Sequence, residues 1–133
     1  MMKRTIGCVA LFGLLMATSL MAHHSLAGVY DMKKDKEVSG TVKSIHFSNP
    51  HGTLTVTVKE ADGKTTDWVM TMGSATSLAG VGVGPTGKNA LHFGDPIKIK
   101  FLPATSGNPL GFLKTVTYPD GHVIVVSMGN PND

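Results

Sequence analysis

A tryptophan and two methionines stand at alternate positions in one short segment, Trp68-Val69-Met70-Thr71-Met72. Residues two apart in a β-strand point to the same face, so Trp68, Met70 and Met72 would share one face. Two thioethers beside an aromatic ring suit soft cations such as Cu(I) or Ag(I), which prefer sulfur ligands. The same pattern fits a hydrophobic core, because Met and Trp fill irregular interiors well. Of these two interpretations, the core is favoured.

Either of two histidines, His46 or His51, would complete a copper site on this face. His46 lies near the end of a strand expected to precede it, and His51 lies in the connection Ser48-Asn49-Pro50-His51-Gly52. An Asn-Pro pair begins turns and a glycine frees the backbone, so a turn is expected here whatever the function. His51 therefore has three open interpretations: a capping residue, a ligand contact or a solvent-exposed side chain.

A second metal-binding hypothesis depends on export. Residues 1–22 run from the basic pair Lys3-Arg4 through an uncharged apolar stretch to a more polar end at Ala22, which is the order of a secretory signal peptide. Cleavage after Ala22 would make His23 the first residue and His24 the second. The free amine and imidazole of His23, with His24 as a third donor, would chelate Cu(II) or Zn(II). We therefore expect a periplasmic or secreted protein.

Composition argues against several classes of protein. The chain has 133 residues with 12 basic and 9 acidic side chains, and a net charge of +3 that would fall to +1 on loss of Lys3 and Arg4. Nothing resembles the clustered basic face of a nucleic-acid-binding protein. The apolar run 6–16 is shorter than the roughly 20 residues of a transmembrane helix. The single cysteine, Cys8, lies in the signal peptide, so the mature chain would contain no disulfide.

The sequence also lacks the motifs typical of enzymes: a nucleophile elbow, a cysteine nucleophile, paired carboxylates or a phosphate-binding loop. We therefore expect a non-enzymatic binding module of unknown ligand, either a small molecule or a metal ion, with no certain cofactor. One alternative is a periplasmic copper-binding or copper-handling protein. The other is an envelope interaction subunit that adds an edge strand to a partner protein, which an exposed apolar edge would favour.

The elements that would position these residues are β-strands. Alternating and β-branched runs predict six strands, over 37–47, 53–59, 65–72, 97–101, 110–118 and 122–127. Residues 74–79 predict a short helix that Gly73 or Ser74 caps and Gly80 ends. In the first strand the apolar residues change parity, which predicts a bulge near Lys43 or Ser44.

Three strands, a short helix and two or three further strands follow the order of an oligonucleotide/oligosaccharide-binding (OB) fold. The predicted fold is therefore an all-β, OB-like Greek-key barrel of five or six strands with its helix between strands 3 and 4. Residues 23–36 would form an N-terminal arm, 37–128 the barrel and 129–133 a tail. An open sandwich of the same strands is the main alternative, because sequence alone does not fix barrel closure.

The sequence resembles two known families of proteins. Residues 23–125 resemble a family of short secreted bacterial proteins of unknown function, through His23-His24-Ser25, Asn49-Pro50-His51 and Gly94-Asp95. This resemblance implies no particular activity. Trp68, Met70 and Met72 are more weakly similar to the ligands of the periplasmic copper and silver chaperones of the CusF type, which are small five-stranded barrels. The second resemblance implies a Cu(I) or Ag(I) site with a histidine as a further ligand.

Overall fold

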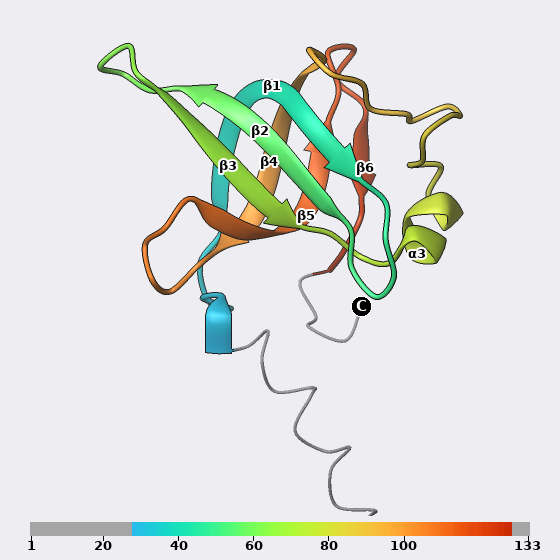
Figure 1. Cartoon of the computed structure of the whole chain (residues 1–133), viewed down its shortest axis with the longest axis horizontal. Helices are drawn as coiled ribbons and strands as arrows, with labels where there is room; N and C mark the ends of the chain where they lie inside the picture. Colours follow the sequence, from blue (N-terminus) through green and yellow to red (C-terminus); the bar gives the residue numbers. More distant parts are fainter. Residues whose placement is uncertain (1–27, 129–133) are drawn as a thin grey trace, which may run out of the picture.

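The computed structural model describes residues 28–128, which contain six strands and the short helix α3 (Figure 1). The strands are β1 (Lys36–His46), β2 (Thr53–Lys59), β3 (Thr65–Thr71), β4 (Pro96–Pro103), β5 (Leu110–Thr117) and β6 (Val123–Val125). Helix α3 spans Ala75–Gly80 and lies between β3 and β4, as predicted. The predicted signal peptide, the histidines His23 and His24, and the tail 129–133 lie outside the described residues. No helix within residues 28–128 is long and apolar enough to cross a membrane.

Strand β2 illustrates why these segments form strands. Its apolar residues Leu54, Val56 and Val58 are buried, and the threonines between them face away from the core. A slip of one residue would move the whole apolar set to the outer face, so the alternation fixes the register. β2 pairs antiparallel with β1 on one side and with β3 on the other.

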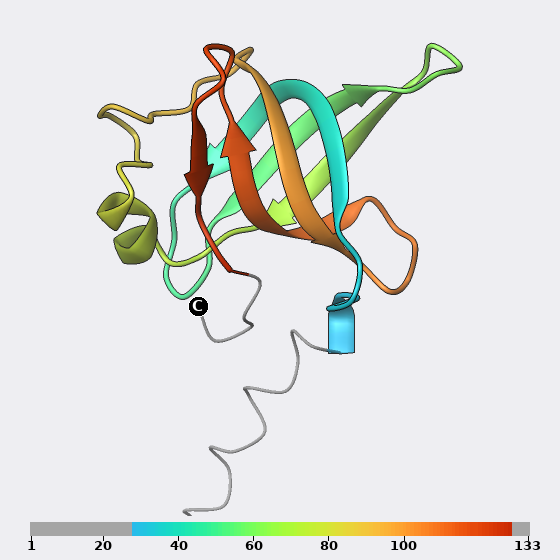
Figure 2. The same cartoon turned by 180° about the vertical axis from the view of Figure 1, so that it is seen from behind.

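The sheet closes into a barrel through a parallel pairing of β3 with β5. The strand order is β3-β2-β1-β4-β5-β6, and the closing contact sets Val69 opposite Leu110 and Thr71 opposite Phe112 (Figure 2). Strand β6 extends the sheet beyond the five strands of the barrel by pairing with the second half of β5. The predicted OB-like barrel is therefore confirmed, and closure excludes the open sandwich.

Strand β1 bends, so that its two halves pair with different strands of the barrel. Its first half pairs with β4 and its second half with β2, and the register with β2 shifts between Val42 and Ser44. The bulge predicted near Lys43 or Ser44 is confirmed at this point. A bulge inserts one residue and increases the local twist, which lets one strand curve around the barrel.

The barrel interior is filled with side chains. The largest fully buried ones are Phe101, Phe112, Leu54, Met70, Met72, Leu78, Ile99 and Leu113. A second, smaller cluster forms where the N-terminal arm meets the barrel: Tyr30 packs with Leu102, Ala104 and Phe112, and its hydroxyl lies 2.7 Å from Thr71 Oγ1. The arm therefore contributes Tyr30 to the packed structure.

Strand β6 is shorter than the predicted strand 122–127. The backbone N–H groups of Val126 and Ser127 both donate to the carbonyl oxygen of Lys114, at 2.8 and 3.2 Å. Two donors on one acceptor break the regular one-to-one ladder, so the strand ends at Val125.

Candidate functional site

Three of the predicted ligand residues, Trp68, Met70 and Met72, lie in the core. Trp68 packs against Phe101 with ring centroids 5.1 Å apart, and the Lys36 Nζ lies 4.2 Å from the centroid of the Trp68 ring. An ammonium group thus already makes a cation–π contact with this indole. The Trp68 Nε1 group is buried without a hydrogen-bond partner within residues 28–128. Met70 is fully buried and faces Gly111 at the barrel seam.

Near Gly52 the backbone of His46 and the methyl group of Met72 come close, and the His51 ring contacts the Met72 backbone. A methyl group added at Gly52 would lie 2.6 Å from the carbonyl oxygen of His46 and 3.0 Å from the Met72 methyl group. His51 Nδ1 lies 3.2 Å from the Met72 carbonyl oxygen. A carbonyl only accepts, so Nδ1 carries the proton, and the neutral ring then has its lone pair on Nε2. The seven predicted ligand residues therefore do not form one cluster. Trp68, Met70 and Met72 share the core, His51 contacts the Met72 backbone and the His46 side chain is exposed, while His23 and His24 are not described.

The Asn49-Pro50-His51 turn attaches helix α3 to the barrel. Asn49 Oδ1 accepts a hydrogen bond from the backbone N–H of Ala75 at 3.1 Å, and His51 bonds to Met72 at the end of β3. The Asn49–Pro50 peptide bond is cis. Ser74, one of the two predicted caps, accepts from Ser77 N at the start of α3. The sequence leaves three interpretations of His51 open: a capping residue, a ligand contact or a solvent-exposed side chain. The structure shows a hydrogen bond from its ring to the Met72 carbonyl oxygen, and this bond positions the turn.

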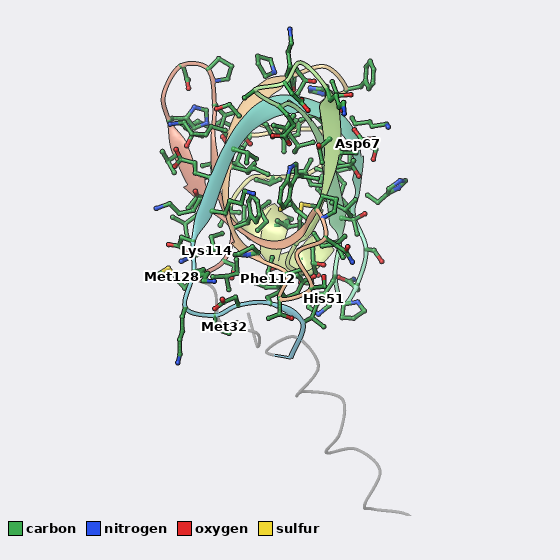
Figure 3. The ribbon with its side chains drawn as sticks, turned by 90° about the vertical axis from the view of Figure 1, so that its left-hand side faces the viewer. Met32, His51, Asp67, Phe112, Lys114 and Met128 are labelled. Atoms are coloured by element: carbon green, nitrogen blue, oxygen red, sulfur yellow. The ribbon has the colours of Figure 1, made fainter. Side chains whose placement is uncertain are left out.

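Charged side chains within residues 28–128 are spread over the surface as separate ion pairs. The principal pairs are Lys43 with Asp67, Lys98 with Glu37, and Lys114 with Asp35. Hydrogen bonds from Lys43 and then from Thr57 lower the pKa of the Asp67 carboxyl. In this part of the chain no group of three or more His, Cys, Asp and Glu side chains is arranged to hold a metal ion. In Figure 3, Asp67 lies in the upper part of the view, whereas His51 and Phe112 lie in the lower part.

An open groove of about 260 Å³ crosses the outer surface where β1, β4 and the end of β5 meet. Its lining residues are Ser39, Gly40, Pro96, Ile97, Lys98, Thr117, Tyr118 and Pro119. Sequence reasoning missed this groove because its walls come from three strands that become neighbours only in the folded barrel. The one available signal was the alternation that turns Ser39 and Lys98 outward.

A polar cluster beside this groove joins the loop before β4 to the turn between β5 and β6. His122 Nδ1 lies 2.5 Å from Asp120 Oδ1, and His122 Nε2 lies 3.1 Å from Asn89 Oδ1. The Tyr118 ring stacks on the His122 ring at 4.2 Å, and the Tyr118 hydroxyl donates to the Asn89 carbonyl oxygen at 2.8 Å. From sequence, His122 was only a histidine next to a turn, and nothing indicated that Asn89 is buried (5 % exposed).

Fold and surface together define a small closed β-barrel of OB-like strand order with a shallow outer groove. The chain belongs to a family of unknown function, DUF6152, whose model matches residues 13–114. The expected membership of a family of unknown function is thereby confirmed. The match ends within β5, before Tyr118, Asp120 and His122. No curated protein and no solved structure matches the chain, and the similarity to copper chaperones stays a prediction from sequence.

Proposed function

We propose that this protein is an exported, non-enzymatic binding module that takes its ligand on the outside of the barrel. The observation that carries this proposal is the open groove over β1, β4 and β5, beside an interior already filled by core side chains. Small barrels with packed interiors bind ligands on outer strand faces and loops. The ion pairs of the described residues are spread over the barrel surface, and the pair at the groove, Lys98 with Glu37, offers opposite charges to a polar ligand.

The groove combines an apolar floor with polar edges. Pro96 and Pro119 supply apolar surface, while the hydroxyl groups of Ser39 and Thr117 stand along the strands. At one edge, Lys98 Nζ lies 3.2 Å from Glu37 Oε1, so the rim offers one positive and one negative group. A small ligand with a flat apolar part and a polar or charged edge matches this lining.

Chemical-shift mapping with two aromatic probes tests the groove. Benzoate and benzylamine share a ring and differ in charge, and we expect either or both to shift the amide signals of Gly40, Ile97 and Thr117. Ser39→Trp would fill the groove and abolish these shifts. Thr53→Trp places the same bulk at an exposed strand position elsewhere on the barrel, and should leave the shifts intact. Shifts that are absent in the native protein, or that survive Ser39→Trp, would overturn the proposed site.

Export has a separate test. The support for it is the basic, apolar and polar order of residues 1–22. Expression of the full chain followed by fractionation and N-terminal sequencing should yield a periplasmic or secreted product that begins at His23. A cytoplasmic product that retains Met1 would refute export.

Copper handling is the second candidate function, and the burial of Trp68, Met70 and Met72 in one cluster, with the His51 ring against the Met72 backbone, supports it. In competition with a chromophoric Cu(I) chelator, His51→Gln and Met72→Leu should each weaken Cu(I) binding. Met32→Leu, in the N-terminal arm, is the control that should bind like the native protein. Failure of the native protein to compete would exclude this site.

The terminal-amine hypothesis for Cu(II) is tested separately, on the cleaved protein. One residue added before His23 should weaken Cu(II) binding, because the first amine would no longer belong to a histidine. Unchanged affinity would rule out chelation by the amine and imidazole of His23.

A further inference from the structure

The loop 82–91, called the strap below, lies between α3 and β4 and reaches the turn between β5 and β6 (Figure 2). Val83 and Leu91 anchor its two ends in the core, at 1 % and 3 % exposed. Gly82, just before the first anchor, and Gly87, between the anchors, adopt positive φ angles of 77° and 117°, which other residues rarely take. Between its fixed ends the strap is held by a backbone hydrogen bond from Asn89 N–H to the Gly82 carbonyl oxygen at 3.2 Å and by side-chain bonds of Asn89.

Asn89 makes those bonds. Its Nδ2 donates to the Val81 carbonyl oxygen at 2.9 Å, and its Oδ1 faces His122 Nε2 at 3.1 Å. The first bond fixes the amide orientation, because a flipped amide would set its oxygen against the oxygen of Val81. Oδ1 only accepts, so His122 Nε2 must carry a proton to complete the bond.

The other ring nitrogen of His122 also faces an acceptor. Asp120 Oδ1 lies 2.5 Å from Nδ1 and accepts from the His122 backbone N–H at 3.0 Å. The hydrogen bonds from His122 lower the pKa of the Asp120 carboxyl, so this group is ionised at neutral pH. Both ring nitrogens therefore donate, and the doubly protonated imidazolium is the form that satisfies all of these contacts.

We propose that His122 is a pH-dependent latch that holds the strap against the β5–β6 turn when its ring is doubly protonated and releases Asn89 when the ring becomes neutral. The proton leaves Nε2 for water, because the proton on Nδ1 is held by the Asp120 carboxylate. The Nε2 lone pair then faces the lone pairs of Asn89 Oδ1, and the bond is replaced by repulsion.

Each element packed against His122 contributes to this arrangement. The turn supplies Asp120, the end of β5 supplies the stacked Tyr118, and the strap supplies the neutral Asn89. Burial, and then the charge of Asp95, raise the pKa of Tyr118, so its hydroxyl remains a donor to Asn89 O throughout the range in which histidines titrate. The nearby His92 instead faces Asp95, with His92 Nδ1 3.5 Å from Asp95 Oδ2.

Trypsin cleavage after Lys88 reports whether the strap opens, because Lys88 directly precedes Asn89. Cleavage after Lys64, in the exposed hairpin turn, corrects for the pH dependence of trypsin itself. From about pH 6 to about pH 8, we expect the ratio of Lys88 to Lys64 cleavage to rise about tenfold, the size expected for loss of a charge-assisted hydrogen bond. Ring 15N shifts of His122 should show both nitrogens protonated at the lower pH and Nε2 unprotonated at the higher pH.

Two variants complete the test. His122→Phe keeps a ring against Tyr118 but removes both donors, so the ratio should be high and independent of pH. His92→Phe should retain the native response. A native ratio that does not change with pH, a response that survives His122→Phe, or a ring that keeps its Nε2 proton at the higher pH would each overturn the latch.

Discussion

The sulfur atom of Met70 lies against Gly111 at the seam where β3 and β5 close the barrel. A methyl group added at Gly111 would lie 2.9 Å from Met70 Sδ and 2.3 Å from the Phe101 ring. Met70 and Gly111 are also direct partners in the parallel pairing. Because Gly111 has no side chain, strands β3 and β5 can pair here while the side chains of Met70 and Phe101 pack against the same point.

Gly111→Ala should destabilise the protein by about 1–3 kcal/mol, because the extra methyl group overpacks a filled core. Urea unfolding followed by tryptophan fluorescence measures the change, since Trp68 is part of the same core. Gly80→Ala is the matched control: a methyl group there meets nothing within 4 Å, at the last residue of α3. Its stability should equal or exceed that of the native protein, and equal losses in the two variants would contradict the seam argument.

The Asn49 side chain gives a second prediction. Its Oδ1 accepts from Ala75 N at the start of α3, so Asn49→Ala should cost about 1 kcal/mol, as loss of a helix cap does. Ser48→Ala is the control, because the Ser48 hydroxyl makes only a 3.5 Å contact with the neighbouring Asn49 carbonyl oxygen. Chemical denaturation measures both variants. An Asn49→Ala protein as stable as Ser48→Ala would show that the turn does not hold the helix.

The order of the elements could be predicted from sequence because each signal was local. Leu54, Val56 and Val58 alternate within one strand, and the parity change near Lys43 lies within another. Barrel closure was not determined, because it depends on how Gly111, Met70 and Phe101 fit together across three strands. Local patterns describe one strand at a time, whereas closure is a property of strands that meet only in three dimensions.

The candidate site was less predictable for the same reason. Alternation correctly placed Met70 and Met72 on the inner face, yet it could not show that Met70 packs on Gly111 while Met72 packs beside Gly52. The bond between Asn89 and His122 joins residues 33 positions apart, from a loop and from the start of the predicted strand 122–127. Such a contact leaves no periodic pattern in the sequence.

Tyr30 carries a third prediction, about the N-terminal arm. It is buried at 7 % exposed, with its ring 5.8 Å from Phe112 and its hydroxyl 2.7 Å from Thr71 Oγ1. Tyr30→Ala should cost about 3 kcal/mol through the lost aromatic packing, and Tyr30→Phe only about 1 kcal/mol through the lost hydrogen bond. Thermal unfolding measures both. If Tyr30→Ala were as stable as the native protein, the arm would not be part of the folding unit.

The ion pair of Lys43 with Asp67 sets the response of the protein to acid. Hydrogen bonds from Lys43 and Thr57 lower the pKa of Asp67 in the folded protein below its ordinary value of about 3.9. The folded state thus favours the ionised carboxylate, so the stabilisation is fully present above that ordinary value and is lost as the pH falls through the lower folded-state pKa. The Asp67→Asn substitution removes the carboxyl group and therefore its contribution to the pH dependence of stability. Below about pH 4, the free energy of unfolding of the Asp67→Asn protein should fall less steeply than that of the native protein.

Urea midpoints measured from neutral pH into this acid range give the comparison. Glu60→Gln, at an exposed position beside the hairpin turn, serves as the control and should follow the native curve. High salt should reduce the difference, because the larger contribution comes from the exposed Lys43 partner, and the part that remains reports the Thr57 hydroxyl, which donates to Asp67 Oδ1 at 2.7 Å. If the urea midpoints of Asp67→Asn and the native protein changed in parallel with pH, the pKa of Asp67 would be the same in the folded and unfolded states, and the prediction would be wrong.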